Sequence, residues 1–284
     1  MLKVGFIGAG TVGTALAVLL TSKGYNFVGA SRLHAHNKTG RPVSNLHILD
    51  SNQAVADNAD LVFITTPDAA IAKVASEVRW HKGQSVIHCS GADSIDILEP
   101  ARKAGAKTGC FHPLQTFAGV KEAIENIPGS AFALEAQEPL LAALKQMADD
   151  LGGNWIILKA ADKAAYHAAA MIACNGLVTL VKLAADLWQT FSIPTDQAVK
   201  ALLPLLRGTI HNIETIGLPD CLTGPIARGD AGTIKKHLDT LRVKAPELLP
   251  FYKELALQMV RIASAKGTLV TKQARELELL LEGK

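Results

Sequence analysis

The sequence predicts an α/β protein in which a doubly wound parallel sheet is followed by an all-α domain. Through the first half of the chain, short apolar runs alternate with helical stretches, which is the pattern of strand–helix–strand units. The runs are continuously apolar, as in Leu61–Ile64, and this is typical of parallel strands buried on both faces. Beyond residue 159 the strand pattern ends and amphipathic helices follow. We therefore expect a sheet domain in residues 1–159 and a helical domain in residues 160–284.

The elements of the first domain follow one another along the chain. Its last helix ends at a pair of glycines, which is a common helix stop. The predicted strands are Val4–Ile7, Phe27–Ala30, Leu61–Thr65, Ser85–Cys89, Ala131–Leu134 and Trp155–Leu158, and the predicted helices are Val12–Ser22, Ala69–Val78 and Glu138–Leu151.

The second domain is predicted to be entirely helical. Its helices are Asp162–Thr190, Thr195–Glu214, Asp230–Lys244, Pro246–Lys266 and one from Thr271, separated by proline and glycine. The most apolar stretch, Ala168–Val181, is interrupted by Asn175 and flanked by His167 and Lys182, so we expect a buried core helix too short to span a bilayer. Because this helix is apolar around most of its circumference and needs burial on several sides, we also expect the protein to form a homodimer through the helical domain.

Composition narrows the class of protein. The chain has 284 residues, a hydrophobic content of 49% and a net charge of +3, which suit a globular protein with a sizeable core. The dispersed charge predicts no nucleic-acid partner and no membrane partner. Four cysteines without a CxxC pair, and an N-terminus without a signal peptide, predict a reducing, cytoplasmic setting.

A glycine motif follows the first strand and opens the first helix. In that context GxGxxG predicts a dinucleotide site of the Rossmann type, because the glycines permit a tight turn, close approach of a pyrophosphate and close helix packing. The predicted cofactor-binding residues of this turn are Gly8, Ala9, Gly10, Thr11, Val12 and Gly13.

The residues after the second strand favour NADP over NAD. An acidic residue normally ends this strand when the cofactor is NAD, but here the chain has Ser31 and Arg32. A hydroxyl and a guanidinium can bind the 2′-phosphate that a carboxylate would repel. The alternative is that Arg32 is a solvated loop residue. His34 and His36 follow, and without carboxylate or cysteine neighbours we expect no metal site there.

The third strand ends in a polar turn. Thr65, Thr66 and Pro67 should lie over the cofactor at the carboxyl edge of the sheet, although a purely structural turn would use the same residues.

Two polar segments, His88–Ala92 and Cys110–Phe117, should reach the same edge. Hydride transfer needs a group that protonates or polarises the receiving atom, and histidine suits this role, so His112 is a catalytic candidate. The alternative is a loop imidazole that caps the backbone before proline. Ser90, Gln115 and Thr116 are candidate substrate-binding residues, with turn formation as the alternative for Ser90.

The helical domain adds further candidates. A continuous helix places His167, Met171, Cys174 and Asn175 on one face, so two polar groups project from an apolar stripe. A core histidine bonded to its neighbours is one explanation, and a bound ligand is another. His167 and Asn175 are therefore catalytic candidates. Thr223 and Arg228 are candidate substrate-binding residues, where Arg228 either holds a carboxylate or pairs with an acidic neighbour.

The segments GAGTVG, SR, TTPD, HCSGA, FHPLQTF, YHAAAMIACN and LTGPIARGD, in this order, resemble a bacterial family of Rossmann-like proteins with a C-terminal DUF2520 domain. The match covers essentially the whole chain, and FHPLQTF and LTGPIARGD are its most specific parts. The family is similar to the 6-phosphogluconate dehydrogenase-like superfamily, with pyrroline-5-carboxylate reductase, ketopantoate reductase and hydroxyisobutyrate dehydrogenase as relatives. The resemblance implies an NADP-linked reductase with a dimerising helical domain.

One departure from these relatives concerns the catalytic lysine. The hydroxyacid dehydrogenases use a lysine and an asparagine four residues apart, and here Asn175 is matched while Met171 stands at the lysine position. His167 or His112 would have to replace that lysine. The sequence thus predicts an NADP-dependent oxidoreductase acting on a small carbonyl or imine substrate, a 2-oxo acid or a cyclic imino acid. The alternatives are a non-catalytic dinucleotide-binding sensor and an NADP-linked deazaflavin reductase.

Overall fold

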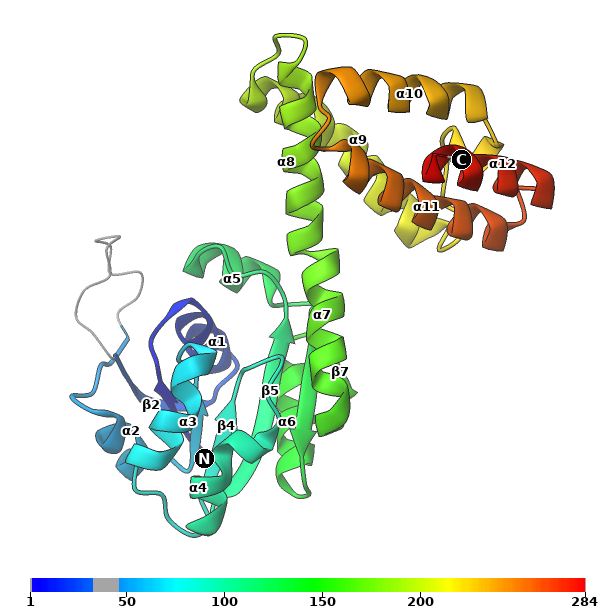
Figure 1. Ribbon diagram of the computed structural model, residues 1–284. Coiled ribbons are helices and arrows are strands. Elements are labelled where there is room, and N and C mark those ends of the chain that lie inside the picture. The colour runs from blue at the N-terminus through cyan, green and yellow to red at the C-terminus, as the bar shows by residue number, and fades with distance from the viewer. Residues whose placement is uncertain (1, 33–45, 284) are drawn as a thin grey trace. The chain divides into compact units, whose positions relative to one another are not determined.

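The computed structural model describes residues 2–32 and 46–283. It divides the chain into two compact units, Met1–Cys174 and Asn175–Lys284. A seven-stranded sheet in the order β2-β1-β3-β4-β5-β6-β7 forms the centre of the first unit (Figure 1). The strands are β1 Lys3–Ile7, β2 Asn26–Ser31, β3 Leu61–Ile64, β4 Ser85–His88, β5 Lys107–Leu114, β6 Ala131–Ala136 and β7 Asn154–Ile157.

The first five strands are parallel, and this confirms the predicted α/β class. β6 runs antiparallel to β5, and β7 runs parallel to β6. The strand order reverses between β1 and β3, because β2 lies on one side of β1 and all later strands lie on the other. Ligands of open α/β sheets bind at the carboxyl ends of the strands beside such a switch point.

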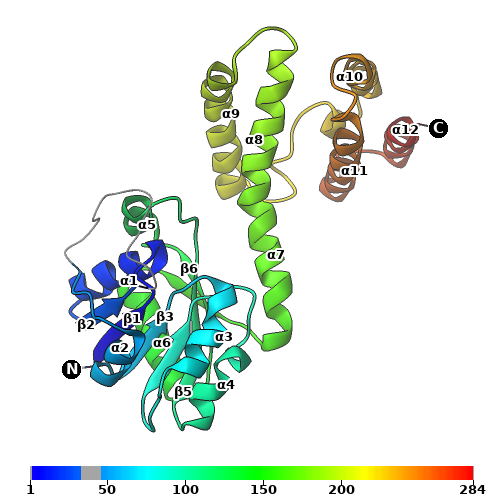
Figure 2. The ribbon, with the colours of Figure 1, turned by 60° about the vertical axis from the view of Figure 1, so that its left-hand side comes forward.

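Helices cover both faces of the sheet (Figure 2). Buried side chains of α1, α5 and α6 pack on one face against Phe6, Phe63, Phe111 and Phe132. Those of α2, α3 and α4 pack on the other face. Neighbouring strand residues divide between the two faces, as period-two alternation requires. The helices are α1 Thr11–Ser22, α2 Asn52–Asn58, α3 Asp68–Glu77, α4 Glu99–Lys103, α5 Val120–Asn126 and α6 Leu140–Asp150.

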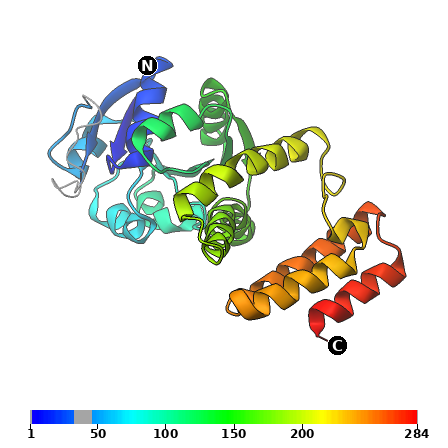
Figure 3. The same cartoon turned by 90° about the horizontal axis from the view of Figure 1, so that it is seen from above.

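The remaining helices are α7 Lys163–Ala173, α8 Asn175–Gln189, α9 Thr195–Thr215, α10 Ala231–Lys244, α11 Leu249–Lys266 and α12 Thr271–Glu282. The strands end at Ile157, beside the expected boundary at residue 159, but the first compact unit also includes α7. In the second unit, α8 packs on α9. The three last helices enclose a separate apolar core and lie side by side in orange and red (Figure 3).

The expected buried core helix is not buried. In the Ala168–Val181 stretch, Ile172 is 69% exposed and Val178 is 68% exposed, because no described part of the chain covers them. The expectation that this helix is too short to span a bilayer is also wrong, because only Cys174 separates α7 from α8 and the two form one long helical run. By length and composition alone, the run Ala160–Gln189 could cross a membrane, and 6% of its most apolar window is buried. Such a single helix is weak support for a membrane protein.

The structure adds elements that the pattern did not predict. β5 replaces what we expected to be a loop around His112, because the cysteine, histidine and proline of Lys107–Leu114 hid the strand pattern. The predicted helix Asp162–Thr190 is divided into α7 and α8. The short helices α2, α4 and α5 fall in stretches without a clear apolar period.

Candidate functional site

The glycine turn after β1 is held between the ends of β2 and β3. The N–H groups of Gly8 and Ala9 donate to the Ser31 carbonyl at 3.1 and 2.9 Å. The Thr65 hydroxyl donates to the Gly8 carbonyl at 2.7 Å. Gly8 has a φ of +108°, and a Cβ there would lie 2.7 Å from the Thr66 nitrogen, so this position requires glycine. The turn therefore sits at the switch point of the sheet.

The same turn leaves room for a ligand where the motif needs it. A Cβ on Gly10 would meet nothing within 4 Å, whereas a Cβ on Gly13 would collide with Thr65 and the Gly8 carbonyl. No side chain caps α1, so N–H groups of its first turn remain available to an anion. The Thr66 hydroxyl is buried without a partner among the described residues. An open cradle, an uncapped helix and an orphaned hydroxyl fit a pyrophosphate-bearing cofactor.

Ser31 and Arg32 end β2 in different environments. Ser31 is 1% exposed and its hydroxyl donates to Asn52 Oδ1 at 2.6 Å. Arg32 is exposed and has no partner within the described ranges. Arg32 thus offers an exposed guanidinium, while the Ser31 hydroxyl is committed to Asn52. His34 and His36 lie outside the described residues.

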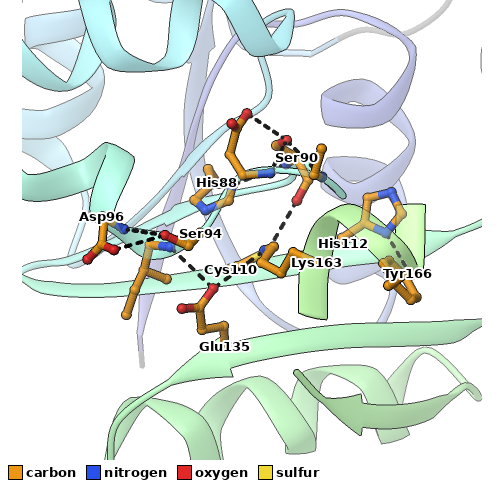
Figure 4. Close-up of polar contacts among 12 residues, drawn as sticks. His88, Ser90, Ser94, Asp96, Cys110, His112, Glu135, Lys163 and Tyr166 are labelled. Atoms are coloured by element: carbon orange, nitrogen blue, oxygen red, sulfur yellow. Dashed lines mark hydrogen bonds and ion pairs between the residues drawn. The ribbon is translucent and has the colours of Figure 1, made fainter. Parts of the chain in front are cut away.

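A histidine–tyrosine pair lies past the carboxyl end of β4 (Figure 4). β4 ends at His88, which lies opposite Cys110, and β5 continues past that point to Leu114. His112 therefore projects from β5 above the end of β4. Its Nδ1 lies 2.9 Å from the Tyr166 hydroxyl of α7.

Gly91 brings a second imidazole to this place. The centroids of the His112 and His167 rings are 6.3 Å apart. A Cβ on Gly91 would lie 2.8 Å from Nε2 of His112 and 2.8 Å from Cδ2 of His167, so the backbone of the loop after β4 touches both rings. The structure thus brings together two of the three predicted catalytic residues, and both belong to the first unit.

Burial sets the protonation of these groups. Desolvation, helped by His167 and Lys163, lowers the pKa of His112 to about 4. Desolvation raises the pKa of Tyr166 to about 12. At neutral pH the pair is therefore an uncharged imidazole and a protonated phenol, so His112 is not the charged imidazolium donor that an unshifted pKa would allow.

His88 lies directly beneath the loop that carries Gly91. Its Nδ1 accepts the Ser90 N–H at 3.1 Å, and its Nε2 has no partner in the described part of the chain. Burial lowers the pKa of His88 to about 3, so this imidazole is neutral and holds the loop through a fixed tautomer.

The predicted substrate-binding residues of the first unit are mostly engaged with the protein. The Ser90 hydroxyl lies 2.9 Å from carboxylate oxygens of both Asp68 and Asp93, and it accepts the Asp93 N–H. Gln115 bonds the Asn126 carbonyl, the Ser130 hydroxyl and the Thr116 N–H. These contacts give Ser90 and Gln115 a structural role in shaping the loops, while the Thr116 side chain remains exposed.

Three predicted site residues belong to the second unit. Asn175 is the first residue of α8 and is exposed. Thr223 is exposed before η3 Ile226–Arg228, and Arg228 is the exposed last residue of η3. Asp230 caps α10 by accepting the Thr233 N–H at 2.9 Å. The roles of Asn175, Thr223 and Arg228 stay predictions.

The sequence reasoning missed the roles of Tyr166 and Gly91. Tyr166 precedes the predicted His167, and this adjacency was the available signal. Gly91 could be interpreted only once β5 was known to bring His112 beside it. Across residues 2–32 and 46–283, no three His, Cys, Asp or Glu side chains are grouped to hold a metal ion.

Comparison with known proteins supports the two-part architecture. Residues 1–113 match a Rossmann-like domain, and residues 130–259 match a domain of unknown function, DUF2520. Among curated proteins, none matches the sequence.

Solved structures share the fold at low identity. A proposed NADP oxidoreductase from Bacteroides fragilis is 24% identical, with a TM-score of 0.72 over 91% of this chain and 97% of that chain. Pyrroline-5-carboxylate reductase from Streptococcus pyogenes is 18% identical, with a TM-score of 0.63 over 98% of both chains. A reductive aminase from Aspergillus terreus is 15% identical, with a TM-score of 0.60 over all of this chain and 93% of that chain. The chain thus carries a match to a Rossmann-like domain followed by a match to DUF2520, in the order that its motifs predict.

Proposed function

We propose that this protein is an NADP-dependent oxidoreductase that reduces a small carbonyl or imine compound. The observation that carries the proposal is the His112–Tyr166 pair against Gly91, on the same sheet edge as an open glycine cradle. The structural relatives include a proposed NADP oxidoreductase, a reductive aminase and an imine reductase, which agrees with this assignment.

Arg32 and the glycine turn would hold the cofactor. The exposed guanidinium of Arg32 suits the 2′-phosphate, and the first turn of α1 suits the pyrophosphate. When bound, the nicotinamide supplies the hydride.

His112 and Tyr166 would supply the proton. As the Nε2 proton of a neutral His112 passes to the substrate oxygen or nitrogen, the Tyr166 hydroxyl would pass its own proton to Nδ1, so the imidazole stays neutral and the resulting phenolate regains a proton from water. This arrangement needs no imidazolium, in agreement with the lowered pKa of His112. His167 lies beside the same loop and is exposed, so it can orient the substrate.

The test is steady-state oxidation of NADPH with a panel of small 2-oxo acids and cyclic imines. In the His112→Asn variant, Oδ1 keeps an acceptor for Tyr166 but Nε2 is lost. We expect turnover to fall roughly 10²–10⁴-fold with NADPH affinity unchanged. Tyr166→Phe removes the phenol that returns a proton to Nδ1, so turnover should fall by a comparable factor.

Tyr25→Phe is the matched control. It removes a hydroxyl that bonds Asp150 at 2.6 Å, away from the sheet edge, so turnover should not change. Tight NADPH binding without turnover of any compound would favour a dinucleotide-binding sensor instead.

A further inference from the structure

One charged side chain beneath this site has no role in the proposed proton transfer. Lys163 is the first residue of α7 and is 1% exposed. Its Nζ donates to the Cys110 sulfur at 2.9 Å and lies 3.6 Å from Glu135 Oε2. Taking an ammonium out of water costs several kcal/mol unless partners compensate, so a buried lysine needs a specific explanation.

The partners of Lys163 are themselves attached to the loop after β4. Burial raises the pKa of Cys110 to about 11, so its sulfur stays a thiol that accepts from Lys163 and donates to the Ser90 carbonyl at 3.4 Å. Glu135 Oε2 also accepts the Ile95 N–H at 3.2 Å. One ammonium thus joins α7, β5, β6 and the Ser90–Ile95 segment (Figure 4).

Three of these elements carry groups of the candidate site, namely β5, α7 and the Ser90–Ile95 segment with Gly91. His112 follows Cys110 by two residues in β5 and so points to the same face of the strand. Tyr166 and His167 follow Lys163 by three and four residues and so lie above it on one face of α7.

We propose that Lys163 is a positioning residue, which fixes α7 against β5 so that Tyr166 and His167 meet His112. This inference rests on the proposed function only where turnover is measured, and its titration test does not depend on that function. The charge of Lys163 also reaches the site, because it acts with burial and His167 to keep His112 uncharged. The titratable groups around His112 are Lys163, Tyr166 and His167 from α7, Cys110 from β5, and His88 from β4.

Lys163→Met is the main test, because methionine keeps the length of the side chain and removes its charge and donors. The variant removes one partner of a buried ion pair and leaves the Glu135 carboxylate without compensation, so we expect a lower melting temperature than wild type, and activity is compared well below it. Turnover should fall about 10–100-fold with the KM for NADPH unchanged, as expected for misplacement of reacting groups by under an ångström. In the protein without cofactor, the NMR titration midpoint of His112 should rise, by less than the effects of burial and His167, because Lys163 is the smallest of the three causes that lower this pKa.

Two variants separate positioning from general damage. Cys110→Ser keeps an acceptor for Lys163 and should preserve both turnover and the His112 midpoint. Lys103→Met makes the same change at a lysine whose side chain is 75% exposed and pairs with Glu99 at 3.6 Å, and it should change neither quantity.

Glu135→Gln provides a second route if Lys163→Met does not fold. It keeps an acceptor for the Ile95 N–H but leaves the ammonium uncompensated, so the His112 midpoint should fall below that of wild type. An unchanged midpoint in folded Lys163→Met, or a raised one in Glu135→Gln, would overturn the inference. Failure to oxidise NADPH would instead refute the proposed function, since the titration needs neither cofactor nor substrate.

Discussion

Replacing Gly91 by alanine should disable the candidate site without disturbing the cofactor turn. The added methyl carbon would lie 2.8 Å from His112 Nε2 and 2.8 Å from His167 Cδ2. Ordinary contacts between such atoms are about 3.5 Å or more, so the rings or the loop must move by about 0.7 Å in total at each contact. Gly91 has no positive φ, so the effect comes from the collision and not from backbone strain. Because His112 is bonded to Tyr166 at 2.9 Å, displacing its ring also weakens the proton relay.

The assay is NADPH oxidation with the best compound of the panel, together with calorimetric NADPH binding. Misplacement approaching 1 Å costs up to about 10²-fold in rate, so we expect a 10–100-fold loss of kcat with unchanged NADPH affinity. Overpacking should also lower the free energy of unfolding by about 1–3 kcal/mol. Gly208→Ala is the control, because a Cβ there meets nothing within 4 Å and alanine favours the helix interior. Wild-type turnover in folded Gly91→Ala would refute the importance of this contact.

Three further predictions concern cofactor choice, acid stability and assembly. Arg32→Ala should weaken NADPH binding by about 1.5–3 kcal/mol and leave NADH binding unchanged in calorimetry; an equal effect on both would refute the 2′-phosphate contact. The folded pKa of His88, about 3, lies below its unfolded value of 6.5, so the stability it contributes is present above pH 6.5 and is lost as the pH falls toward 3. In His88→Asn, Oδ1 can still accept the Ser90 N–H. The free energy of unfolding measured in urea should therefore fall less steeply with decreasing pH than in wild type, and an equally steep fall would exclude His88 as a cause of the acid sensitivity. Sedimentation should show a homodimer that Val178→Lys disrupts and Val243→Lys, 81% exposed on α10, does not; a wild-type monomer at micromolar concentration would contradict the helical-domain interface.

The parts of the fold that the sequence predicted well are those where one local pattern suffices. Leu61–Ile64 is apolar throughout because both faces of β3 are covered, and the structure places these four residues in the core. β5 was missed for the opposite reason. Gly109, His112 and Pro113 break the apolar run, and their strand geometry comes from pairing with β4 and β6, which no local pattern contains.

The candidate site shows the same division. The spacing of the glycines identified the turn at the switch point, because each glycine is required by the backbone geometry of the turn itself. The contact between His112 and Tyr166 depends on how far β5 extends beyond β4 and on where α7 begins. Burial of the Ala168–Val181 stretch within the chain was predicted wrongly. A helix that is apolar on all sides indicates that its surface must be covered, but the pattern does not indicate whether the same chain or a second one covers it.

The sheet order makes the proposed cofactor and proton-transfer roles separable. Arg32 follows β2, one strand from the glycine turn of β1, whereas His112 lies on β5, three strands away on the other side. With about 4.8 Å between neighbouring strands, the two residues flank the turn at roughly 5 and 14 Å along the carboxyl edge. A dinucleotide whose pyrophosphate lies on the turn must send its two halves in opposite directions, so its adenosine half would meet Arg32 and its nicotinamide half would run toward His112. Loss of Arg32 should therefore change affinity and spare turnover at saturating NADPH, while loss of His112 should do the reverse. A single variant at either end that changed both quantities equally would contradict this orientation of the cofactor.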